Sequence, residues 1–165
     1  MRQKLARTSA APGKTRLANV YRVARGSGAP LYLVDLPGYG YAKGDRGELE
    51  AVARAYFEER PNPAGLLVVD ARHPGLENDR AAWRWLERTA GRCALVATKI
   101  DKLARGERIR ALRQCESVFE TSVLPASADT GEGVDELWRT IERLASSQPA
   151  GTTATAATRP PHRKK

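Results

Sequence analysis

Hydrophobic residues recur along the 165-residue chain in two distinct patterns. Short apolar runs of about four to eight residues are typical of strands, and apolar residues spaced three and four apart are typical of amphipathic helices. The runs that predict strands are 17–24, 30–36, 65–70, 93–98 and 122–127. The segments that predict helices are 47–60, 78–90, 107–119 and 134–145. Because helices and strands alternate from residue 47 onward, we expect an α/β fold with a mostly parallel sheet.

Local signals refine several of these elements. Gly26-Ser27-Gly28 separates the first two strands and predicts a hairpin-like connection. The run 65–70 is apolar without alternation, which is typical of a strand buried on both faces. Trp83 and Trp85 lie two residues apart on a predicted helix whose apolar side carries Trp85, so they do not share a face.

The formal net charge of +9 is concentrated at the two ends of the chain. Residues 1–34 hold seven Lys or Arg and no acid, and residues 156–165 hold four more. Such ends attract polyanions in a salt-sensitive way, although the C-terminal cluster is equally explained as a solubilising tail. Residues 146–165 are rich in Ser, Ala, Thr, Gly and Pro, so we expect one domain over 1–145 followed by a disordered basic tail.

The composition excludes several classes of protein. With 41% hydrophobic residues the chain can build a core, and its apolar runs are too short to span a bilayer. No apolar segment follows the basic N-terminus, so a secretory signal peptide is not expected. Cys93 and Cys115 have no spacing typical of a metal site or disulfide framework. These features predict a cytoplasmic protein without a membrane partner.

Small polar clusters follow three predicted strands, where open α/β sheets bind their ligands. They are Asp35-Leu36-Pro37-Gly38, Thr98-Lys99-Ile100-Asp101 and Ala126-Ser127-Ala128. A carboxylate such as Asp101 can accept both N–H donors of the guanine edge, which adenine does not offer, while the stem of Lys99 lies along the purine. The residues 126–128 are small, so a backbone N–H of this cluster could reach the guanine carbonyl. Taken singly, each cluster is equally a turn or a solvated loop.

The order and spacing of longer motifs resemble the EngB family of bacterial GTPases, which are related to Era. The matching segments are 5–9 (LARTS), 12–16 (PGKTR), 33–42 (LVDLPGYGYA), 70–74 (DARHP) and 98–103 (TKIDKL). The resemblance extends from about residue 4 to residue 145 and implies a P-loop GTPase-type fold with three layers. It also implies GTP and GDP binding, a role in large ribosomal subunit assembly and normal cell division or septation, and a monomer that meets large-subunit precursors and rRNA.

The resemblance implies a set of site residues. Thr15 would bind Mg²⁺, Asp35 would hold a water on that ion, and Gly38 would approach the γ-phosphate, with K⁺ as a candidate activator. Thr98 stands where most GTPases have Asn, so base selection would depend on Asp101 and Lys99. The nucleotide-binding residues implied in this way are Gly13, Lys14, Thr15, Arg16, Leu17, Asp35, Leu36, Pro37, Gly38, Thr98, Lys99, Ile100, Asp101, Ala126, Ser127 and Ala128.

The chain departs from the family in its phosphate loop. The 165 residues contain no G-x-x-x-x-G-K-[ST], and Gly13-Lys14-Thr15 lies in the switch motif instead. The resemblance then implies that a central strand, the loop and a helix are missing, and that apolar strands on either side of the gap are partly exposed. Three interpretations stay open: a mis-assigned start of a full GTPase, a non-hydrolysing rRNA-binding module, or a non-functional fragment.

Whether the chain hydrolyses GTP also stays open. Tyr39 occupies the position where Ras-type enzymes place a Gln that positions water, and its ring does not supply the same hydrogen bond. No catalytic residue is assigned. Asp70, Arg72 and His73 match a family signature, but their residue types suggest no chemistry, and His73 is interpreted as structural.

Overall fold

In the computed structural model, the described residues are 18–24, 30–36, 46–59 and 63–146. The chain begins with two strands and a helix, which are β1 (Asn19–Val23), β2 (Leu31–Asp35) and α1 (Arg46–Glu58). Strands and helices then alternate in the order β3 (Ala64–Asp70), α2 (Glu77–Thr89), β4 (Arg92–Thr98), η1 (Ile100–Lys102), α3 (Arg105–Phe119), β5 (Val123–Pro125) and α4 (Val134–Ser146). Every strand and helix predicted from the sequence is present.

The described strands form two sheets. β1 and β2 pair antiparallel, as the predicted hairpin requires, and their connection lies outside the described residues. β3, β4 and β5 form a parallel sheet with β4 in the centre. Among the described residues no ladder joins the two sheets. Tyr32 of β2 and Val68 of β3 are 62% and 56% exposed, so the run 65–70 is not buried on both faces as its unbroken apolar sequence predicted.

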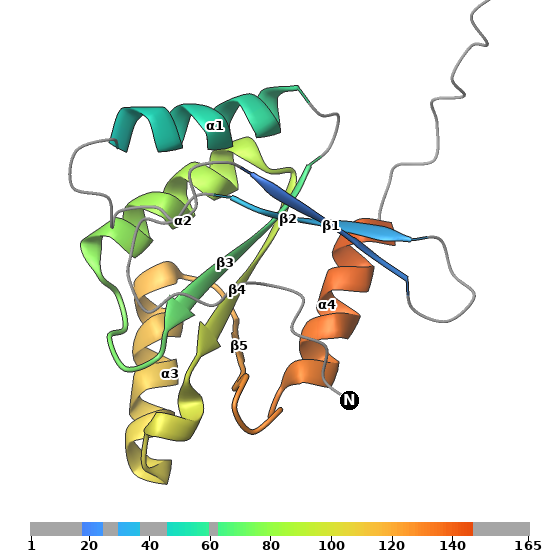
Figure 1. The fold of residues 1–165 in the computed structure, drawn as a ribbon. Coiled ribbons are helices and arrows are strands. Elements are labelled where there is room, and N and C mark those ends of the chain that lie inside the picture. Colours follow the sequence, from blue (N-terminus) through green and yellow to red (C-terminus); the bar gives the residue numbers. More distant parts are fainter. Residues whose placement is uncertain (1–17, 25–29, 37–45, 60–62, 147–165) are drawn as a thin grey trace, which may run out of the picture.

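Helices cover both faces of the parallel sheet (Figure 1). α2 and α3 lie on one side and α4 on the other, so the domain has three layers. The core lies between the sheet and α1, α2 and α3, and includes Phe57, Leu95 and Cys115. α2 approaches β3 so closely that a Cβ on Gly65 would lie 2.4 Å from Cδ1 of Leu86. The fold class is therefore the predicted α/β class, with a parallel sheet preceded by an antiparallel hairpin.

The two tryptophans of α2 point toward different helices. Trp83 is buried and meets Phe119 of α3 edge to face at 6.4 Å between ring centroids. Trp85 is half-buried and meets Phe57 of α1 in the same way at 5.3 Å. The prediction that the two rings do not share a face is confirmed, but Trp83, which was not among the residues of the predicted apolar side, is the more deeply buried ring.

Element ends differ from the predictions by one or two residues. α3 begins at Arg105 instead of 107, because the Glu107 carboxylate accepts a hydrogen bond from the Ala104 amide and closes the first turn. α4 extends through Ser146, which was predicted to belong to the tail, and the Ser146 hydroxyl donates to the Glu142 carbonyl. Residues 147–165 lie outside the described residues. None of the described helices is both long and apolar enough to cross a membrane.

Candidate functional site

The carboxyl ends of the three parallel strands meet at one edge of the sheet. Asp70 at the end of β3 pairs with Thr98 at the end of β4, and Ala97 pairs with Pro125 at the end of β5. The segments that follow these strands therefore emerge side by side. Two of the three predicted clusters, 98–101 and 126–128, are brought together in this way, and the signature 70–74 joins them.

The chain turns sharply where β4 ends. The Thr98 hydroxyl donates to the Val69 carbonyl at 2.9 Å, and Lys99 adopts the left-handed conformation with φ of 61°. Ile100 then enters the short helix η1 and is fully buried. Because Ile100 anchors this turn in the core, Lys99 before it and Asp101 after it are held in place, with the Lys99 side chain 53% exposed and the Asp101 side chain 12% exposed.

Asp101 is held by Ser127 from the next loop. The buried Ser127 hydroxyl donates to Oδ1 of Asp101 at 2.6 Å, and the Lys102 ammonium lies 3.0 Å from Oδ2. The Ser127 hydrogen bond, followed by the one from Lys102, lowers the pKa of Asp101 below its ordinary value. Asp101 is therefore an ionised carboxylate that presents hydrogen-bond acceptors at the sheet edge.

The loop after β5 is folded tightly so that Ser127 keeps its place. The Ser127 amide donates to the Glu132 carbonyl, the Gly131 amide donates to the Ser127 carbonyl, and the Thr130 amide donates to the Ser127 hydroxyl. At the end of the loop Gly133 has φ of +75°, and a Cβ there would lie 2.0 Å from the Pro125 carbonyl oxygen. Only glycine fits this approach without movement of the backbone.

Two of the three predicted backbone donors in this loop are already used within the protein. The Ala126 amide donates to the Ala97 carbonyl, and the Ser127 amide donates to Glu132. Of the three predicted donors, the amide of Ala128 is therefore the one left as a candidate to reach a base carbonyl, and Ala128 is exposed. Ser127 acts through its hydroxyl instead.

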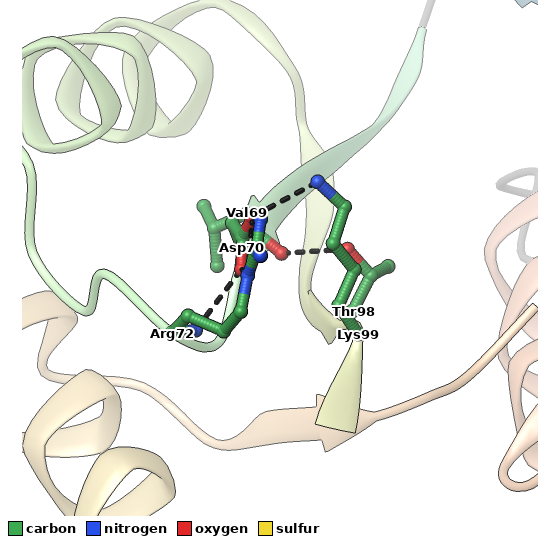
Figure 2. Close-up of polar contacts among 5 residues, drawn as sticks. All are labelled: Val69, Asp70, Arg72, Thr98 and Lys99. Carbon is green, nitrogen blue, oxygen red and sulfur yellow. Dashed lines mark hydrogen bonds and ion pairs between the residues drawn. The ribbon is translucent and has the colours of Figure 1, made fainter. Parts of the chain in front are cut away.

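Asp70 and Arg72, whose residue types suggested no chemistry from the sequence, both lie at this site (Figure 2). The Arg72 guanidinium donates to both carboxylate oxygens of Asp70 through Nε and Nη2, and its amide donates to Oδ1. The Lys99 ammonium donates to Oδ2 of Asp70 at 2.9 Å. The Arg72 guanidinium, with further help from Lys99, holds the pKa of Asp70 well below its usual range. The only available sequence signal was the DARHP motif itself.

Arg72, one of the two charged side chains around Asp70, lies close enough to Asp101 to interact with its charge. The pKa of Arg72 is raised, chiefly by the hydrogen bonds to Asp70 and to a smaller extent by the nearby charge of Asp101. His73 follows in the same turn, where its amide donates to the Asp70 carbonyl and its side chain is exposed. Asp70, Arg72, Lys99 and Asp101 therefore form one charged group over the ends of β3 and β4.

The predicted phosphate and metal side is described only in part. Asp35 ends β2 with an exposed side chain that accepts a long, 3.5 Å hydrogen bond from Asn19, and Leu36 packs against the core. Residues 13–17, Pro37 and Gly38 lie outside the described residues. Within the described ranges no group of three His, Cys, Asp or Glu side chains forms a metal site. The exposed carboxylate of Asp35 fits a Mg²⁺ ion that binds together with the nucleotide, because Mg²⁺ is usually held by one or two carboxylates plus phosphates.

Comparison with known proteins decides the family. Residues 1–99 match the family described as 50S ribosome-binding GTPase. The probable GTP-binding protein EngB of Alkaliphilus oremlandii is 37% identical over 151 residues, which cover 87% of this chain and 71% of that protein. The EngB protein of Clostridioides difficile is 38% identical, over 85% of this chain and 71% of its own length. This chain belongs to the EngB family of GTP-binding proteins.

Solved structures confirm the fold that this membership implies. Era in complex with MgGDPNP and nucleotides 1506–1542 of 16S ribosomal RNA matches with a TM-score of 0.72 and 21% identity, over 92% of this chain and 51% of the Era chain. A probable GTP-binding protein engB matches with a TM-score of 0.61 and 16% identity, over 81% of this chain and 84% of that one. Both are P-loop GTPases, and the α/β architecture of this EngB family member is theirs.

Proposed function

We propose that this protein binds GTP and GDP, with the base recognised at the carboxyl edge of β4 and β5. The observation that carries the proposal is the ionised Asp101 carboxylate, fixed by the buried Ser127 hydroxyl at 2.6 Å. A carboxylate held this way accepts the N1–H and N2–H donors of guanine together, and adenine has no such pair. The Lys102 ammonium lies 3.0 Å from Oδ2 of Asp101 and 2.9 Å from Oδ2 of Asp129, so it keeps an anionic partner if the base takes its place on Asp101.

The remaining proposed contacts to the nucleotide and its Mg²⁺ are those that membership of the EngB family implies. Lys99 lies along the purine face, and the Ala128 amide reaches the guanine carbonyl. Thr15, within the switch motif, and Asp35, through a water, hold the Mg²⁺ that accompanies the phosphates, and Gly38 approaches the γ-phosphate. The remaining predicted contact residues are Gly13, Lys14, Arg16, Leu17, Leu36, Pro37 and Thr98. The other predicted residues, Ile100, Ala126 and Ser127, are buried and support the site from beneath. No described residue is assigned to hydrolysis, so the proposal is nucleotide binding.

The proposed cellular role is assembly of the large ribosomal subunit in the cytoplasm, with the effect on cell division and septation that the family resemblance implies. Two observations support it. The matching family is described as 50S ribosome-binding, and the chain carries a formal net charge of +9 that lies mainly outside residues 35–158. Basic ends of this kind strengthen contacts to rRNA phosphates.

Ligand-observed NMR is the experiment that tests base recognition. These 165 residues contain no G-x-x-x-x-G-K-[ST], so we expect the contacts to the base to supply much of the binding free energy and the affinity to be low. Saturation-transfer NMR is suited to this case because it detects weak binding. We expect saturation of GDP and GTP but not of ATP at equal concentration, with the strongest transfer to the guanine H8. Equal transfer to GTP and ATP would contradict a guanine-selective site.

The ribosomal proposal predicts salt-dependent association. Binding to large-subunit precursors, measured by co-sedimentation, should weaken steeply between low and physiological salt because counterions are released from rRNA. Replacing four basic residues of the tail by Gln should reduce the slope of log K against log salt without abolishing binding. Those residues are Arg159, Arg163, Lys164 and Lys165. Binding that does not change with salt, or no binding at any salt, would contradict the electrostatic account.

A further inference from the structure

Asp70 lies in the candidate site without a role in the proposed base contacts. It is the last residue of β3, its side chain is only 20% exposed, and it accepts hydrogen bonds from two cations. One is Arg72, two residues along its own turn, and the other is Lys99, on the neighbouring strand end (Figure 2). Both cations could reach solvent instead, so their convergence on one carboxylate needs an explanation.

We infer that Asp70, itself held by Arg72, is a positioning residue that fixes the Lys99 side chain in the orientation needed along the purine face. The inference rests on the proposed nucleotide binding. A lysine has four rotatable side-chain bonds and loses considerable entropy when its stem is ordered on a ligand. An ion pair that orders the stem beforehand removes part of this cost from binding.

The geometry fixes Lys99 at both ends. Its backbone is set by the left-handed conformation at φ of 61° and by the buried Ile100 that follows. Its ammonium is set by Oδ2 of Asp70 at 2.9 Å. With both ends held, the aliphatic stem between them has few orientations left, although the side chain is 53% exposed.

Asp70 is well suited to this task because it cannot move freely. The Arg72 guanidinium forms a fork on both of its oxygens, and the Arg72 amide donates to Oδ1 at 3.0 Å. Asp70 is also the ladder partner of Thr98, the residue immediately before Lys99, and Thr98 bonds across to Val69. The sheet register therefore sets the position of the carboxylate relative to the lysine.

A double-mutant cycle separates positioning from general stability. We expect Asp70→Asn to weaken GDP binding about three- to tenfold, because the ammonium loses its anionic partner. In a Lys99→Ala background the same Asp70 substitution should cause no further loss. Asp135→Asn, an exposed carboxylate at the start of α4, is the matched control and should leave GDP binding unchanged. Effects of the two site substitutions that simply add would overturn the inference.

Base selectivity provides a second test. A stem lying along a purine does not sense the donor pattern of the base edge, so Asp70→Asn should weaken GDP and inosine diphosphate by the same factor. A change in the ratio of the two affinities would contradict a role through Lys99. If Asp70→Asn does not fold, Arg72→Gln is the second variant, with a smaller loss of affinity that again disappears with Lys99→Ala.

A nucleotide-free measurement keeps this inference separate from the proposed function. Acetic anhydride labelling with mass spectrometry should modify Lys99 slowly in the unmodified protein and several-fold faster in Asp70→Asn, with Lys102 as internal reference. Unchanged Lys99 labelling would overturn the positioning role even if GDP binds. Failure of the unmodified protein to bind any guanine nucleotide would instead remove the proposed function, and this inference with it.

Discussion

Asp101→Asn is expected to convert guanine selectivity into xanthine selectivity. The carboxamide offers one acceptor and one donor, which match the edge of xanthine, where the guanine amino group is replaced by a carbonyl. Loss of the charge-assisted pair should weaken GDP binding about ten- to a hundredfold, while binding of xanthosine diphosphate improves. Saturation-transfer titrations with the two nucleotides measure the ratio directly.

Two variants make this result specific. Asp135→Asn changes the same residue type on α4 and should leave both affinities as they are. Ser127→Ala removes the hydroxyl that donates to Asp101 and should weaken GDP without favouring xanthosine diphosphate, because the carboxylate is still present. Unchanged GDP binding by the Asp101 variant would remove Asp101 from the site.

The elements of the fold were predictable because their hydrophobic periods are clear. The apolar run at 65–70 predicted a strand of a parallel sheet, and β3 is that strand. Apolar residues three and four apart before Gly91 predicted a helix, and α2 is that helix. The burial of Trp83 was not predictable from that period alone. It depends on α3, whose Phe119 packs on Trp83, while Phe57 of α1 packs on Trp85, so that α2 meets a helix through each tryptophan. Such burial on two sides is a tertiary feature that a single helix does not encode.

The site residues that lie together in one short motif could be predicted from the sequence. Those that are brought together only by pairing of the strands could not. Thr98-Lys99-Ile100-Asp101 was identified from its residue types and its place after a strand. The contact between Asp70 and Lys99 joins residues 29 apart, and it exists only because β3 and β4 pair in the register Asp70 with Thr98. The residues that hold a functional side chain are therefore seen only once strand order and register are known.

The same reasoning identifies Gly133 as a residue on which the site depends without touching it. The loop from Ala126 to Gly133 returns onto the end of β5, and Gly133 lies against the Pro125 carbonyl. This return places the Glu132 carbonyl where it accepts the Ser127 amide. The position of the Ser127 hydroxyl, and so of Asp101, depends on how closely the loop approaches the strand.

Gly133→Ala is accordingly expected to damage both stability and base binding. A Cβ would lie 2.0 Å from a backbone oxygen that no side-chain rotation can relieve, and φ of +75° is unfavourable for alanine. The expected loss of stability is about 3 kcal/mol, which corresponds to a fall in Tm of roughly 6–12 °C. Because the loop must move away from Pro125, GDP binding should weaken together with the ability of Ser127 to hold Asp101.

Gly91→Ala is the matched control, since a Cβ there meets nothing within 4 Å, and it should change stability by less than about 0.5 kcal/mol. Thermal denaturation and GDP titration of the two variants side by side decide the matter: equal melting temperatures would show that the loop does not need its close approach to β5.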